Sequence, residues 1–97
     1  MASASIQDLY DDSETLRGLA DAKPEAFHRF FEAWFPRVYA HALRDLASRP
    51  HAEAVTRRCL RRALEEVRRV DPDTPLAPWL LTLLKREIAF ARRATSP

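Results

Sequence analysis

The chain has 97 residues, of which 31% are charged, and its formal net charge is only +2. This length suits a single domain with one core that needs neither disulfides nor a metal. So small a net charge does not indicate nucleic-acid binding by itself. The sequence also contains no run of about 18 apolar residues that would cross a bilayer, so we expect no membrane association.

The charge is unevenly distributed along the chain. Residues 1–49 carry six basic and eight acidic side chains, a net −2, whereas residues 50–97 carry ten basic and six acidic ones, a net +4. The basic half is suited to meet a polyanion. A normally solvated helical surface explains the same charges, so both interpretations stay open at this point.

The single cysteine, Cys59, has no partner for an internal disulfide, which is typical of a reducing compartment. Its place on the apolar side of a predicted helix favours a buried thiol over a reactive one. The first residues have neither the basic cluster nor the apolar run of a secretory signal. We therefore expect a cytoplasmic protein.

The composition favours an all-α protein. Ala, Leu, Arg and Glu dominate, β-branched residues are sparse, and Gly18 is the only glycine. We expect a compact bundle of three main helices plus one short N-terminal helix, which Ser13 would cap. Residues 1–12 are expected to form a flexible acidic tail, and residues 13–97 the helical domain.

The first main helix is predicted over Pro24–Leu46. Its apolar residues recur at intervals of three and four, and Pro24 suits the first helical position. Pro36 lies inside this run and is expected to kink the helix. We expect Phe27, Phe31 and Trp34 to be buried in the core.

The second and third main helices are predicted over His51–Val70 and Pro75–Arg93. Ser48-Arg49-Pro50 is expected to form a turn before the second helix, and Thr74 or Asp73 to cap the third. The core is expected to include Val55, Cys59, Leu80, Leu83 and Leu84. Oppositely charged residues four apart also give the arginines of the second helix a purely structural explanation; the pairs are Glu53–Arg57, Arg61–Glu65, Arg62–Glu66 and Glu65–Arg69.

Catalytic and metal-binding constellations are missing from the sequence. Glu25 and His28 have the spacing of one helical di-iron half-site, but such a site needs a second pair and two further carboxylates. We find no glycine-rich phosphate loop and no nucleophile motif. We therefore expect no enzyme activity, no metal or cofactor, and no small-molecule ligand.

Several short motifs occur in a characteristic order and spacing. They are Ala26-Phe27; Trp34, Pro36, Arg37 and Tyr39; Ala52-Glu53; Pro75; Trp79-Leu80; and Arg92-Arg93. In this order the chain resembles region two of bacterial extracytoplasmic-function sigma factors over roughly residues 13–93. That family's second domain, a helix-turn-helix that reads the −35 promoter element, has no counterpart in these residues.

The resemblance implies two binding surfaces. In the family, the second main helix docks on a coiled coil of the RNA polymerase β′ subunit, which implies a polymerase-binding set of Glu53, Ala54, Arg57, Arg58 and Arg61. The following loop and last helix bind single-stranded −10 promoter DNA. The residues that correspond to this DNA-binding role are Trp79, Thr82, Lys85, Arg86, Arg92 and Arg93.

The sequence departs from the family pattern within these surfaces. Ala54 stands where the family has Asp, Arg57 where it has Gln, Arg86 where Asn is common, and Phe90 where Asp is common. Two hypotheses therefore remain. The chain is either a minimal sigma-like transcription protein that binds polymerase or −10 DNA, or a sigma-like module repurposed to bind a protein such as an anti-sigma factor. An exposed basic groove near Trp79 and Arg86 would favour the first, and an exposed apolar patch around Phe90 or along the second main helix would favour the second.

Overall fold

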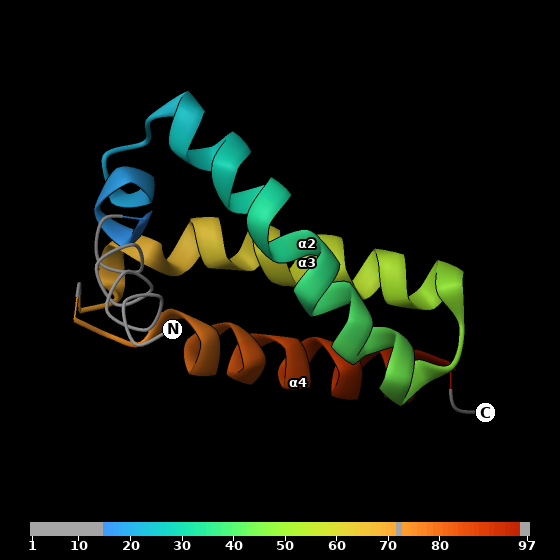
Figure 1. Ribbon diagram of the computed structural model, residues 1–97. Coiled ribbons are helices and arrows are strands. Elements are labelled where there is room, and N and C mark those ends of the chain that lie inside the picture. The colour runs from blue at the N-terminus through green and yellow to red at the C-terminus, as the bar shows by residue number, and fades with distance from the viewer. Residues whose placement is uncertain (1–14, 72, 96–97) are drawn as a thin grey trace, which may run out of the picture.

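Three long helices and one short helical segment account for most of the described chain (Figure 1). The structure, a computed structural model, describes residues 15–71 and 73–95. Its helices are residues 15–20, α2 (Pro24–Leu46), α3 (Arg49–Glu66), the 3-10 turn η1 (Val67–Arg69) and α4 (Leu76–Thr95), and these described ranges contain no strand. The predicted all-α bundle is confirmed. The tail predicted over residues 1–12 and the cap predicted at Ser13 lie outside the described residues.

The helix boundaries follow from proline and serine chemistry. Pro24 opens α2 as predicted, without a side-chain cap from Lys23. The turn predicted at Ser48-Arg49-Pro50 is wrong, because Ser48 is the N-cap of α3 and Arg49 and Pro50 belong to its first turn. The Ser48 hydroxyl oxygen accepts a hydrogen bond from the His51 N–H at 3.5 Å. A proline is compatible with this place since the first backbone N–H groups of a helix have no intrahelical acceptor.

At its other end the second predicted helix changes form. The α-helix stops at Glu66, and the last residues before Val70 form the 3-10 turn η1. Beyond it, the loop is organised by Asp71, whose side chain accepts from Asp73 N–H and whose carbonyl accepts from Thr74 N–H, both at 2.9 Å. The cap on α4 by Thr74 or Asp73 stays a prediction, and α4 starts one residue after Pro75.

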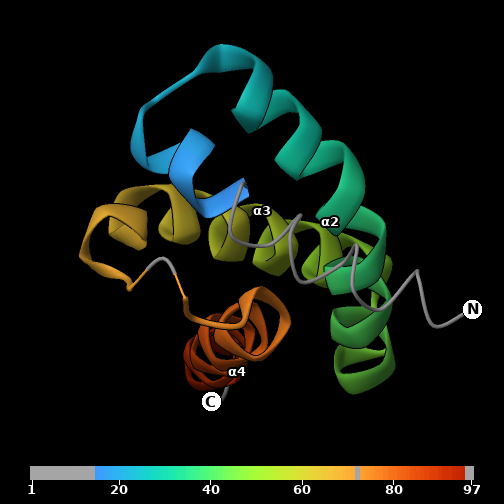
Figure 2. The same ribbon diagram turned by 60° about the vertical axis from the view of Figure 1, so that its left-hand side comes forward.

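α3 is the helix against which the other two long helices pack. α2 and α4 each contact α3 extensively and contact one another over a shorter length, and Figure 2 shows α2 curving across α3 while α4 is seen nearly end-on. Gly18 of the short segment is close to α2, because a Cβ at this position would lie 3.0 Å from the Cβ of Ala26. No helix within the described ranges is long and apolar enough to span a bilayer.

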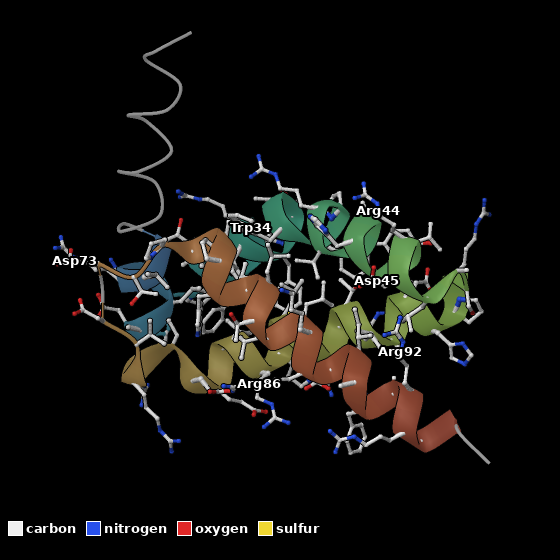
Figure 3. All side chains as sticks on the ribbon, turned by 90° about the horizontal axis from the view of Figure 1, so that it is seen from below. Trp34, Arg44, Asp45, Asp73, Arg86 and Arg92 are labelled. Atoms are coloured by element: carbon white, nitrogen blue, oxygen red, sulfur yellow. The ribbon has the colours of Figure 1, made fainter. Side chains whose placement is uncertain are left out.

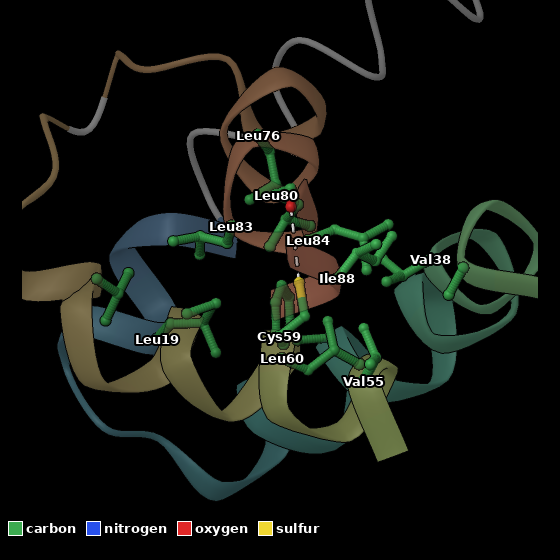
Figure 4. Packing of buried hydrophobic residues seen from close by; sticks show 14 of the residues in the cluster. Leu19, Val38, Val55, Cys59, Leu60, Leu76, Leu80, Leu83, Leu84 and Ile88 are labelled. Atoms are coloured by element: carbon green, nitrogen blue, oxygen red, sulfur yellow. Dashed lines mark hydrogen bonds between the residues drawn. The ribbon is translucent and has the colours of Figure 1, made fainter. Parts of the chain in front are cut away.

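The core lies where α3 meets α2 and α4 (Figure 4). The predicted burial of Val55, Cys59, Leu80, Leu83 and Leu84 is confirmed. The predicted burial of three aromatic residues of α2 is only partial: Phe27, Phe31 and Trp34 are half-buried and pack against the core, and the fully buried ring in that part of the helix is Phe30. The apolar stripe of α2 is wider than the strip that α3 covers, so its edges remain partly exposed.

Candidate functional site

The five residues of the predicted polymerase-binding set lie together on α3. Each is exposed, and they form one continuous face, which we call the α3 outer face; its members are Glu53, Ala54, Arg57, Arg58 and Arg61. The face exists because the buried residues of α3, such as Ala52, Val55 and Cys59, recur at three- and four-residue intervals on the opposite side. The structure therefore leaves this face of the helix open to solvent.

The predicted DNA-binding residues of α4 do not form one cluster. Thr82, Arg86 and Arg93 share one side of the helix by their spacing, whereas Lys85 and Arg92 are rotated away from it. Figure 3 shows Arg92 beside Asp45 of α2, and its guanidinium Nη2 donates to the Asp45 carbonyl at 3.1 Å. Arg92 is thus already held by the protein.

Two members of this set, Trp79 and Thr82, already make contacts within the protein. Trp79 is half-buried and packs against the core. The Thr82 side chain is exposed, but its hydroxyl donates to the Pro78 carbonyl one turn earlier at 3.0 Å. This leaves Lys85, Arg86 and Arg93 as the exposed cations of α4 with no partner shown in the described chain.

A groove of about 490 Å³ runs between α3 and α4. We call it the α3–α4 groove. It is lined by Arg58, Arg61, Arg62, Glu65 and Glu66 from α3 and by Leu83, Arg86, Glu87 and Phe90 from α4. Leu83 is buried and belongs to the core. The groove therefore combines an apolar base with charges of both signs, and it includes two residues of the α3 outer face, Arg58 and Arg61.

One ion pair fixes the two sides of this groove to each other. Arg62 Nη2 lies 3.6 Å from Oε1 of Glu87, a residue that is only 8% exposed. The four ion pairs predicted along one side of α3 are not present; Arg62 pairs across to α4 instead. Arg58, Arg61 and Arg86 form no ion pair or side-chain hydrogen bond with the residues that the structure describes.

Phe90 is the large hydrophobic side chain that stands out on the described surface, because 59% of its area is exposed. It lines the groove together with Arg86, one turn earlier on α4. Sequence reasoning identified Phe90 and Arg86 as departures from the family pattern but did not place them in one groove with arginines of α3. The signal was their four-residue spacing, which puts both on one side of α4.

A second recess, of about 770 Å³, lies beside the short helical segment, α2 and the start of α4. Trp34 lines it, and the guanidinium of Arg37 lies over the Trp34 ring at 5.0 Å from its centroid. One face of this ring is therefore already occupied by a cation–π contact within the protein. This arrangement accounts for Trp34 without a ligand.

Metal-binding and nucleophilic groups do not gather anywhere in the described part of the chain. No three His, Cys, Asp or Glu side chains in residues 15–71 and 73–95 are placed to share a metal ion. His28 pairs with Glu32 at 2.8 Å on the surface of α2, and not with Glu25. Burial, with a smaller contribution from the negative charge of Glu87, raises the pKa of the Cys59 thiol to about 12, which disfavours the nucleophilic thiolate.

Comparison of the chain with protein-family models, with curated proteins and with solved structures finds no match. The two surfaces on α3 and α4 are accordingly interpreted from their own chemistry and from the sequence resemblance.

Proposed function

We propose that this protein is a sigma-factor-like transcription protein that binds the β′ subunit of RNA polymerase through the α3 outer face. One observation carries the proposal: five residues that correspond to the family's polymerase contacts share one exposed helix face, and none of them contributes to the core. Arg57 and Arg61 are not engaged by the intrahelical ion pairs that would have given them a structural role. An exposed polar face without internal partners is suited to an external one.

We also propose that the protein binds single-stranded promoter DNA. The exposed cations of α4, Lys85, Arg86 and Arg93, are suited to contact the phosphates of a single strand. An arginine in place of an asparagine supplies charge but no amide for reading a base edge, so binding is expected to be weakly sequence-selective.

A second candidate function is supported by Phe90. An exposed phenylalanine beside unpartnered arginines is a typical anchor of a protein–protein interface. In this alternative the fold serves as a protein-interaction module, with an anti-sigma factor or an assembly partner as its ligand, and promoter recognition is lost.

The first candidate is tested by restoring the family's residues on the α3 outer face. Ala54→Asp combined with Arg57→Gln replaces a methyl group and a cation by an acid and an amide, and is expected to tighten binding to an isolated β′ coiled coil about tenfold. Titration calorimetry measures this change. The matched control is Ala40→Asp with Arg44→Gln on the exposed side of α2, which should leave the affinity unchanged.

Equal affinities for the wild type and the restored variant would contradict a role of the α3 outer face. That result would favour the protein-interaction module. Circular dichroism of both double variants checks that the helices are retained, as expected for substitutions at exposed positions.

A further inference from the structure

The α3–α4 groove contains both positively and negatively charged side chains that have no partner within the described part of the protein. Arg58, Arg61 and Arg86 have no partner, and Glu65 and Glu66 in the same lining have none either among the described residues. Arg62 and Glu87, by contrast, neutralise each other across the groove. Unpartnered charges of both signs therefore lie within one surface, next to the exposed ring of Phe90.

This combination argues against a polyanion as the occupant of the groove. Phosphates that entered the groove towards Arg58 and Arg61 of α3 would also approach the two free carboxylates of the same helix, and like charges brought together oppose binding. The groove is better matched by a protein surface that has an apolar anchor flanked by charges of both signs.

A second copy of this chain has that surface. In a two-fold symmetric dimer the same patch is used on both subunits, so each residue type in it must find its complement within the same patch. The α3–α4 groove meets this requirement, because its free arginines can face the partner's free glutamates and each Phe90 can enter the partner's groove. We propose that two copies associate through the α3–α4 groove with Phe90 as the central anchor.

The size and nature of the groove fit this role. Its volume of about 490 Å³ accommodates the partner's phenyl ring, and the exposed ring of Phe90 in the same lining gives that ring an apolar surface to pack against. Two aromatic rings that approach across a two-fold axis gain from edge-to-face or offset stacking as well as from burial. Charge pairs around the ring then set the register of the two subunits.

The dimer has a regulatory consequence that rests on the proposed function. Arg58 and Arg61 belong both to the α3 outer face and to the groove lining. A subunit whose groove is covered by a second copy would hold these two arginines in the dimer interface. Self-association and polymerase binding are therefore expected to compete, with the monomer as the polymerase-binding form.

Self-association is measured first by sedimentation of the purified chain over about 1 to 200 μM, a range suited to a small interface. The wild type is expected to convert reversibly from monomer to dimer. Phe90→Ser should weaken the dimer at least about tenfold because each subunit loses its apolar anchor. Lys85→Ser, an exposed change on the other side of α4, is the matched control and should leave association unchanged.

A charge-exchange experiment distinguishes the symmetric dimer from other contacts. One variant carries Arg58→Glu, Arg61→Glu and Arg86→Glu, which leaves the groove acidic apart from Arg62. The other carries Glu65→Arg and Glu66→Arg, which leaves it basic apart from Glu87. Each variant alone should be monomeric, since its two grooves repel, whereas an equimolar mixture should form a heterodimer.

Three outcomes would overturn the proposal: a wild type that stays monomeric over the whole range, a dimer that survives Phe90→Ser, and charge-exchanged variants that fail to associate when mixed. A monomer that binds a single-stranded oligonucleotide through Phe90 would assign the groove to nucleic acid instead. None of these measurements contains polymerase. Absence of self-association would therefore not contradict the proposed polymerase binding, and absence of polymerase binding would not contradict self-association.

Discussion

At the scale of single residues, Cys59 shows how packing sets chemistry. Its side chain is fully buried where α3 meets α4, and its Sγ donates to the Leu80 carbonyl at 3.6 Å (Figure 4). Burial raises the pKa of this thiol from 9.0 to about 12, and the negative charge of Glu87 adds to the shift. Arg62 faces Glu87 from α3 and partly offsets that charge.

The direction of this pKa shift predicts alkaline destabilisation. The folded state keeps the Cys59 proton up to a higher pH than the unfolded state, so unfolding releases a proton and stability falls as pH rises above 9.0. Between about pH 7 and about pH 10 the wild type is expected to lose about 1 kcal/mol more of its free energy of unfolding than Cys59→Ala. Urea unfolding of both proteins at each pH measures the difference.

Comparison with Cys59→Ala removes the contributions of all other titrating groups, which the two proteins share. Parallel pH profiles for the two proteins would show that the thiol is not buried in the folded state. Loss of the methyl-sized volume in Cys59→Ala lowers stability at every pH and does not change the slope.

At the scale of helices, two alanines occupy positions that usually carry glycine. Ala47 follows the last residue of α2 with φ 53°, and its N–H donates to the Leu43 carbonyl at 2.8 Å. Ala22, which follows the segment 15–20, has φ 57°. A left-handed residue ends a helix by satisfying one of its last carbonyls, and an L residue with a Cβ is strained there.

Ala47→Gly is therefore expected to stabilise the protein by about 0.5–1 kcal/mol, since the relief of strain at positive φ exceeds the entropy gained by the unfolded chain. The matched control is Ala40→Gly, the same chemical change at an exposed position inside α2, which should destabilise by about 1 kcal/mol. Thermal unfolding checks both signs. Destabilisation by Ala47→Gly would contradict the left-handed cap.

Local sequence signals predicted that the long helices exist, and they predicted the ends of α2 but not the start of α3. α2 is bounded as predicted because Pro24 opens it and its apolar spacing is continuous to Leu46. The start of α3 was missed because Arg49-Pro50 looks like a turn in sequence and is a first helical turn once Ser48 caps it. Among the aromatic residues of α2, only the packing of the other elements decides that Phe30 is buried while Phe27 and Phe31 stay at the edge.

At the scale of the whole molecule, the candidate surfaces were only partly predictable. Each of the five residues of the α3 outer face lies three or four positions from another in the same helix, so the sequence alone was enough to place them on one face. The α3–α4 groove depends on how two helices align across the core, as the Arg62–Glu87 pair shows. No local sequence pattern specifies that alignment. The predicted ion pairs within α3 would have left Arg62 unavailable for a pair with Glu87 of α4.

A contact between α4 and α2 refines the expected DNA binding. Four cations of the last helix were predicted to contact phosphates, but Arg92 is held at the Asp45 carbonyl (Figure 3). Lys85, Arg86 and Arg93 remain, and three phosphate contacts on a single strand predict a slope of about −2 in a plot of log affinity against log salt. Fluorescence anisotropy over about 20 to 200 mM salt, with a −10-like and a scrambled oligonucleotide, measures it.

Two arginine variants test this assignment within one helix. Arg93→Gln is expected to reduce the magnitude of the slope by about 0.7, as one released counterion fewer requires. Arg92→Gln should reduce it less, because the guanidinium of Arg92 is held at the Asp45 carbonyl and is less free to reach a phosphate. Both oligonucleotides should bind with similar affinity, since phosphate contacts carry no sequence information. Sequence-selective, salt-insensitive binding would contradict the phosphate-contact mechanism, and no binding at the lowest salt would leave the protein-interaction module as the better account of α4.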